Sequence, residues 1–278
     1  MRFFSTRFPT RSPTRFPTTW ALLIWQLAAL LSATLVSGDA DCNGVDGGAA
    51  FLDDCGNCVG VQIGTDIDGE AGDRKGYSVS LSRDGTIMAV GATENDDAGD
   101  NAGHVRVYQN VQGTWTNIGE IDGTAAGDNS GHSVSLSGDG SAVAIGAPYQ
   151  DGYGGVDSGH VRVFRNVAGN WTQIGGDIDG IFRIHHGWSV SLSDDGMTIA
   201  VGATREYARN MWNTVIRPGA VRIYNLVADV WTEIGEISGE ANNDYSGHSV
   251  SLSGDGSTVA IGAIGHGENS GHVRVYQN

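Results

Sequence analysis

The run SGH at residues 130–132 lies beside Asp128, and a serine, an imidazole and a carboxylate together can form an activated nucleophile. Related runs that end in Ser-Gly-His recur at 158–160, 246–248 and 270–272. A catalytic site is seldom copied into several units of a repeat, so we interpret the pattern as part of a repeated loop. The sequence contains no metalloprotease helix motif, phosphate-binding loop or nucleophile elbow. We therefore expect that the protein is not an enzyme.

A second group of chemically active side chains gathers in the two loops at 181–187 and 205–219. It combines basic and aromatic residues on a chain that is otherwise acidic. Its members are Arg183, His185, His186, Arg205, Tyr207, Arg209, Met211, Trp212 and Arg217. Arginine and aromatic side chains commonly anchor interfaces, so we predict a face that binds an acidic protein or an anionic glycan. The alternative is that these loops pack on themselves and bind nothing.

Both groups lie within an internal repeat. The phrase SVSLS begins at residues 78, 133, 189 and 249, which gives periods of 55, 56 and 60 residues. In each copy the apolar positions of this phrase alternate with serine, which predicts a strand with one apolar face. The residue before each phrase is Tyr77, His132, Trp188 or His248, and we interpret these side chains as packing residues.

A full repeat, as in the first three copies, contains four such phrases, and each phrase predicts one strand. An Asp-Gly pair follows the first strand in all four copies, at 84–85, 139–140, 195–196 and 255–256, and predicts a two-residue hairpin. The fourth strand carries Trp115, Trp171 or Trp231 in the first three copies. Antiparallel units of this kind, with small residues on their inner strands, are typical of propeller blades. We predict an all-β fold, a β-propeller of four repeats with four strands per blade at residues 61–278.

The two ends of this repeated region complement each other. The fourth unit has no fourth-strand phrase, whereas residues 59–69, VGVQIGTDIDG, match that phrase ahead of the first unit. We therefore predict that residues 61–64 pair with residues 272–277, so that the N-terminal strand closes the last blade and no sheet edge stays exposed. The alternative is an arc of a larger array.

The phrases GYSVSLSRDGTIMAVGAT at 76–93 and GHVRVYQN at 103–110 resemble the FG-GAP repeats of the integrin α-subunit propeller and its microbial relatives. The resemblance covers about residues 61–278. It implies an extracellular or cell-surface module for binding or adhesion. The chain departs from the family in having no aromatic residue before the glycine of the "FG" half, and a complete "GAP" half only at 146–148. Integrin propellers also have seven blades. The alternatives are a passive component of an extracellular matrix or cell wall, and an enzyme on a propeller scaffold.

The resemblance also raises the possibility of a calcium site. Some members of the family hold the ion in an Asp-rich loop between the first two strands, but the short turn here offers too few of the roughly six to eight oxygens that calcium needs. Other acidic loops remain, with Asp96, Asp97, Asp100, Asp151 and Asp157 as candidate ligands. The alternative is that these residues only form turns. We predict no other cofactor.

The first 38 residues predict a secretion signal. They contain four arginines and no acid, and residues 20–36 form an apolar run before the small residues SGDA. Either the signal is cleaved, or it stays as an anchor and provides the only membrane attachment. The whole chain has a net charge of −16, which disfavours nucleic acid and anionic lipid as partners. We expect a secreted or cell-surface protein.

Residues 39–60 predict a spacer rich in Cys, Gly and Asp. Cys42, Cys55 and Cys58 cannot all pair within one chain, so we expect a disulfide between two of them. A zinc site at Cys55 and Cys58 is the alternative, although no histidine lies nearby in the sequence. Asn170 begins an Asn-Trp-Thr sequon and predicts a glycoprotein.

Overall fold

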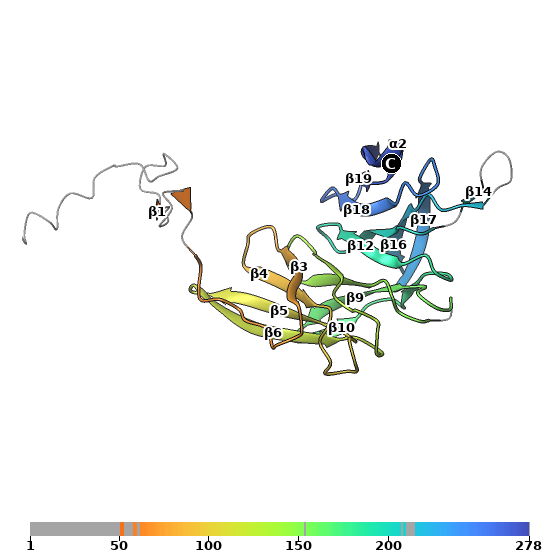
Figure 1. The fold of residues 1–278 in the computed structure, drawn as a ribbon. Coiled ribbons are helices and arrows are strands. Elements are labelled where there is room, and N and C mark those ends of the chain that lie inside the picture. Colours follow the sequence, from red (N-terminus) through yellow and green to blue (C-terminus); the bar gives the residue numbers. More distant parts are fainter. Residues whose placement is uncertain are drawn as a thin grey trace, which may run out of the picture. The chain divides into compact units, whose positions relative to one another are not determined.

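The computed structural model describes residues 51–52, 58–59, 62–152, 154–206, 208–209 and 215–277 (Figure 1). The chain divides into two compact units, Met1–Gln62 and Ile63–Asn278. In the first unit, β1 (Phe51–Leu52) and β2 (Cys58–Val59) form an antiparallel pair. The predicted signal at 1–38, Cys42 and Cys55 lie outside the described residues, so the signal and the disulfide stay predictions.

The described part of the second unit contains four large antiparallel sheets, one for each repeat. Sheet 1 consists of β3 (Lys75–Leu81), β4 (Ile87–Ala92), β5 (His104–Val111) and β6 (Thr114–Asp122), in that order. Sheet 2 consists of β7 (Ser133–Leu136), β8 (Ala142–Ala147), β9 (His160–Val167) and β10 (Asn170–Gln173), with β11 (Ile178–Asp179) also paired to β9. Sheet 3 consists of β12 (His186–Leu192), β13 (Thr198–Ala203), β16 (Ala220–Val227) and β17 (Val230–Ser238). Sheet 4 consists of β18 (Ser246–Leu252), β19 (Thr258–Ala263) and β20 (His272–Gln277).

Two short elements lie outside these sheets. The hairpin of β14 (Ala208–Arg209) and β15 (Val215–Ile216) stands between β13 and β16 in the chain. The helix α2 (His266–Asn269) connects β19 to β20. The predicted all-β fold is confirmed, and its successive four-phrase sheets are consistent with a β-propeller.

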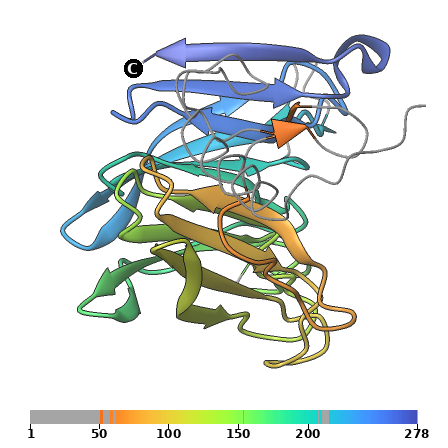
Figure 2. The ribbon, with the colours of Figure 1, turned by 90° about the vertical axis from the view of Figure 1, so that its left-hand side faces the viewer.

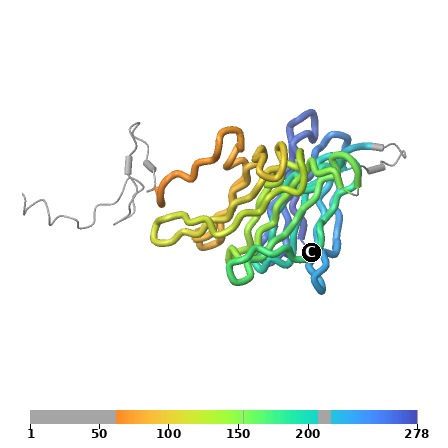
Figure 3. The backbone as a smooth tube through the Cα atoms, turned by 90° about the horizontal axis from the view of Figure 1, so that it is seen from below, coloured from red at the N-terminus to blue at the C-terminus, as the bar shows by residue number. Residues whose placement is uncertain are grey.

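Consecutive sheets pack face to face, in the order of the sequence (Figures 2 and 3). Valines of β5 contact Val134 and Leu136 of β7 across the first of these interfaces, and Val161 and Val163 of β9 contact sheet 3 in the same way across the second. The middle strands are therefore buried on both faces, which explains their continuous apolar runs.

The approach of one sheet to the next is close enough to involve the backbone. A Cβ atom added at Gly91, Gly146 or Gly202 would overlap the carbonyl oxygen of a glycine in the following sheet. Beside each of these glycines, a serine hydroxyl donates a hydrogen bond across the interface: Ser78 to the Gly131 carbonyl, Ser133 to Gly187 and Ser189 to Gly247. Small residues on the first two strands are thus required by the packing of the sheets.

The predicted two-residue hairpins are wrong. The Ser82 amide donates to the Ile87 carbonyl at 2.9 Å, so four residues separate the paired positions, and Gly85 alone among these four has a positive φ. Asp84 explains the longer loop, because its Oδ1 accepts hydrogen bonds from the Ser82 hydroxyl and the Thr86 amide. The same bonds form at Asp139, Asp195 and Asp255.

The predicted closure of the last blade is not found. Within the described residues β20 pairs only with β19, and residues 62–64 form no strand with it. The Ile63 carbonyl instead accepts a hydrogen bond from Trp115 Nε1 at 3.0 Å, which fixes this segment against sheet 1. The equivalent bonds of Trp171 to Ile118 and of Trp231 to Ile174 join each sheet to the one before it. The N-terminal segment therefore takes the place of a strand in a sheet preceding sheet 1.

We predict that Gly146→Ala destabilises the protein by about 3 kcal/mol, because its methyl group would force sheets 2 and 3 apart. Urea unfolding followed by tryptophan fluorescence measures the effect. Gly235→Ala is the matched control, since no heavy atom lies within 4 Å of a Cβ at that position. Equal, small losses of stability in both variants would contradict the close packing described for these sheets.

Candidate functional site

A row of rings crosses the ends of the four first strands. Tyr77, His132, Trp188 and His248, one from each sheet, have successive ring centroids 5.0, 4.6 and 6.0 Å apart. The sequence predicts packing residues at these positions, and the inner two, His132 and Trp188, are partly buried between their neighbours. Tyr77, however, is 48% exposed, so the row reaches the surface.

A pocket of about 320 Å³ opens beside this row. Loops of sheets 2, 3 and 4 line it with aromatic rings, one guanidinium and one carboxylate. The lining residues are Tyr149, Asp157, His185, Trp188, Thr204, Arg205, Tyr245, His248 and Ile264. Another pocket, lined by Ile234, Leu252 and Tyr276, lies between β17 and β20, where sheet 4 lacks a fourth strand. We assign the candidate binding site to the first pocket, because three sheets converge there and its polar groups can orient a ligand.

Burial favours the uncharged form of two imidazoles at this site, those of His185 and His132. His185 is buried and stacks on Trp188 with 5.9 Å between ring centroids, and burial, helped by the charge of Arg205, lowers its pKa. Burial also lowers the pKa of His132 to about 4, although its Nδ1 lies 3.1 Å from the Trp188 carbonyl oxygen. The exposed side chain of Arg205 and the carboxylate of Asp157 are thus the two charged groups of this aromatic pocket whose charge does not depend on a histidine.

The structure brings together only part of the predicted basic and aromatic face. His185 and Arg205 line the pocket, while Arg183 and Arg217 are exposed outside it. His186 lies in the interior, with its Nε2 3.3 Å from the Tyr224 hydroxyl. Tyr207, Met211 and Trp212 lie outside the described residues, as does the side chain of Arg209.

Sequence reasoning missed Tyr149 and Tyr245 and assigned Trp188 to packing. The signal for Trp188 was its repeat position, where all four units carry a ring. Tyr149 and Tyr245 occupy loops whose convergence depends on how the sheets pack, so the sequence offered no comparable signal for them.

Three of the five candidate calcium ligands accept short hydrogen bonds within their own loops. Asp96 accepts from the Asn101 amide at 2.7 Å, Asp100 from the Asn101 side chain at 2.9 Å and Asp151 from the Asp157 amide at 2.8 Å. Calcium binding stays a prediction. In the described part of the chain, three groups of histidine and carboxylate side chains have possible ligand atoms within 4.8 Å of one another: Asp97, His104 and Glu120; His160, Asp177 and Asp179; Glu240, His266 and His272.

Two further predictions concern surface chemistry. Asn170, the sequon residue, is exposed at the first position of β10, and its glycosylation stays a prediction. The helical part of the described chain offers no segment with the length and apolar character needed to cross a membrane.

These features define a class of protein, a repeat of antiparallel four-stranded sheets that pack face to face and present their loops at a shared end. Residues 62–108 and 121–164 match the family described as FG-GAP repeat. These two stretches are therefore similar to FG-GAP repeats, as the sequence resemblance indicated. No curated protein matches the chain.

Stability should fall as the pH is lowered from 7 to 5. Burial lowers the pKa of His186 to about 3, whereas a histidine in the unfolded chain has a pKa of 6.5. Between these two pH values the unfolded chain binds a proton at this residue and the folded chain does not. The loss begins near pH 6.5 and continues towards the folded pKa, at about 1.4 kcal/mol per pH unit for one such group. His160, with a pKa lowered to about 4 by burial, adds to the slope.

His186→Ser isolates this contribution, because sheets 2 and 4 carry serine at the same position. The difference in unfolding free energy between pH 7 and pH 5 should shrink by about 2 kcal/mol, measured by urea titration. At pH 8 histidine is neutral in the folded and the unfolded chain. The difference in unfolding free energy between the variant and the native protein at that pH therefore gives the effect of replacing the histidine by serine apart from protonation. An unchanged slope would mean that His186 is not buried in its neutral form.

Proposed function

We propose that the protein is a binding module of the integrin-α propeller type, which recognises an extracellular protein or glycan and catalyses no reaction. The pocket formed by Tyr149, Trp188 and Arg205 with their neighbours carries this proposal. It lies in loops at one end of the sheets, and loops on a rigid scaffold are the usual carriers of binding function.

The chemistry of the pocket favours a ligand with both a flat apolar surface and an anionic group. Aromatic rings offer large contact areas at a low entropic cost, and a guanidinium binds carboxylate or sulfate through paired hydrogen bonds. Arg205 stands on a chain with a net charge of −16, so it supplies a local attraction that the remaining surface opposes. An anionic sugar or an acidic, aromatic-containing peptide meets these requirements.

The geometry around the Ser-Gly-His run supports binding over catalysis. Ser130 is buried, and its hydroxyl has no hydrogen-bond partner among the described residues. Asp128 accepts hydrogen bonds from the Thr124 hydroxyl and the Ala125 amide, and so caps its own loop. A nucleophile that contacts no base lacks the arrangement that activates serine.

Trp188→Ala and Arg205→Ala should each weaken binding at least about tenfold, which corresponds to about 1.4 kcal/mol. A glycan array and immobilised matrix proteins would identify a ligand, and surface plasmon resonance would measure the affinities. Arg165→Ala, which removes an arginine of β9 outside the pocket, is the control and should bind normally. Equal affinities for all three variants and the native protein would refute the assignment of this pocket.

A further inference from the structure

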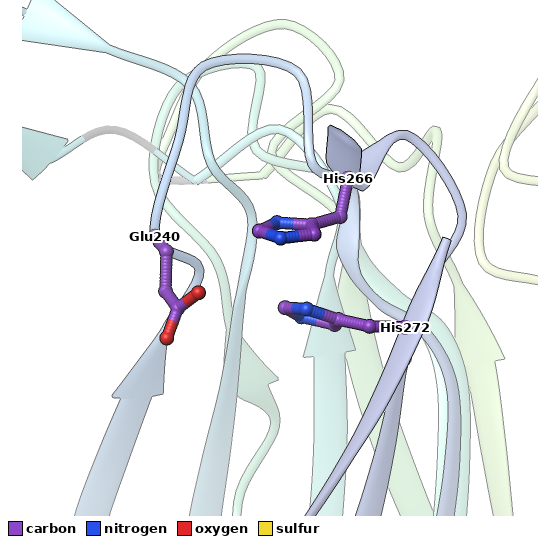
Figure 4. Close-up of side chains that lie close together, drawn as sticks. All are labelled: Glu240, His266 and His272. Atoms are coloured by element: carbon purple, nitrogen blue, oxygen red, sulfur yellow. The ribbon is translucent and has the colours of Figure 1, made fainter. Parts of the chain in front are cut away.

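We infer that Glu240, His266 and His272 bind a divalent transition metal of the zinc class. Glu240 follows β17, His266 begins α2 and His272 begins β20, so sheet 3 and sheet 4 both contribute. Figure 4 shows the two imidazole rings one above the other, with the carboxylate of Glu240 on the side towards which they point. The ring centroids are 3.9 Å apart, and the possible ligand atoms lie within 4.8 Å of one another.

The surroundings prepare both imidazoles to act as ligands. Asp244 is buried, and its Oδ2 lies 3.3 Å from His266 Nδ1 while accepting hydrogen bonds from the Glu240 and Ala241 amides. A carboxylate held in this way fixes the proton on Nδ1 and leaves His266 Nε2 free for a metal. His272 Nε2 is buried without a hydrogen-bond partner in the described part of the chain.

The donor set selects the class of metal. Two imidazoles and a carboxylate suit zinc, copper or nickel, whereas calcium and magnesium prefer oxygen ligands throughout. The other two groups contain one imidazole each, and Arg106 already pairs with Glu120 at 2.7 Å in the group at His104. Arg274 lies 3.4 Å from Glu240, but its Nη2 also donates to the Ser238 carbonyl, so the exposed carboxylate can turn to a metal while the arginine keeps a partner.

Isothermal titration of the metal-free protein with zinc chloride tests this site. We expect one saturable site per chain, a raised melting temperature, and binding weakened on the order of 100-fold in His266→Ala and in His272→Ala. His272→Ala should fold, because sheet 3 carries Ala220 at the same repeat position. Cobalt supplies a second readout, since its visible absorption reports the imidazole ligands directly.

His248→Ala is the control, since it removes a histidine of the same sheet that lies outside the group. It should bind zinc like the native protein. Absence of saturable binding to the native protein would overturn the assignment, and so would variants His266→Ala and His272→Ala that bind zinc as tightly as the native protein.

Discussion

The close packing of one sheet on the next is the interaction on which the other features of this structure depend. Each sheet has apolar residues on both faces of its middle strands, so a sheet alone would expose its core. The distance between sheets is short enough that Gly146 faces the carbonyl of Gly187, and the Ser133 hydroxyl bonds to that same carbonyl. The repeat therefore encodes a contact between sheets as much as it encodes the sheet itself.

The candidate pocket follows from this contact. Each first strand places one ring at its start, and packing brings His132 and Trp188 within 4.6 Å although 56 residues separate them in the sequence. His185 is then held against Trp188 and loses its charge through burial. Because several sheets contribute residues to it, the pocket keeps its shape only while the sheets stay packed on one another.

The sequence predicted the features that depend on local chemistry. The alternation of Val134 and Leu136 with serine gave the strands, and the recurrence of the phrases gave the number of sheets. The turn was misjudged because the Asp84 side chain accepts bonds within its own loop, a competing interaction that an Asp-Gly pair alone does not reveal. Closure was misjudged because pairing between distant strands depends on the rotation from sheet to sheet, which no phrase specifies.

The structure places some residues of the predicted face together, and its use in binding stays a prediction. Composition identified the third repeat as exceptional, and Arg205 and His185 do line the pocket. Two adjacent residues can nevertheless point to different places, because the chain changes direction between them. His186 begins β12 and points into the interior, where its Nε2 lies 3.3 Å from the Tyr224 hydroxyl. His185 precedes the strand with a φ of 56° and lines the pocket.

The apolar packing between consecutive sheets is weakest at sheet 4. Among the described residues, the cluster that joins sheets 3 and 4 has four buried members, against ten in each of the two preceding clusters. Val250 and Leu252 stay partly exposed, whereas Val190 and Leu192 are buried. A metal held by Glu240, His266 and His272 would tie this sheet to its neighbour, and it would act where the free energy of burial between sheets is smallest.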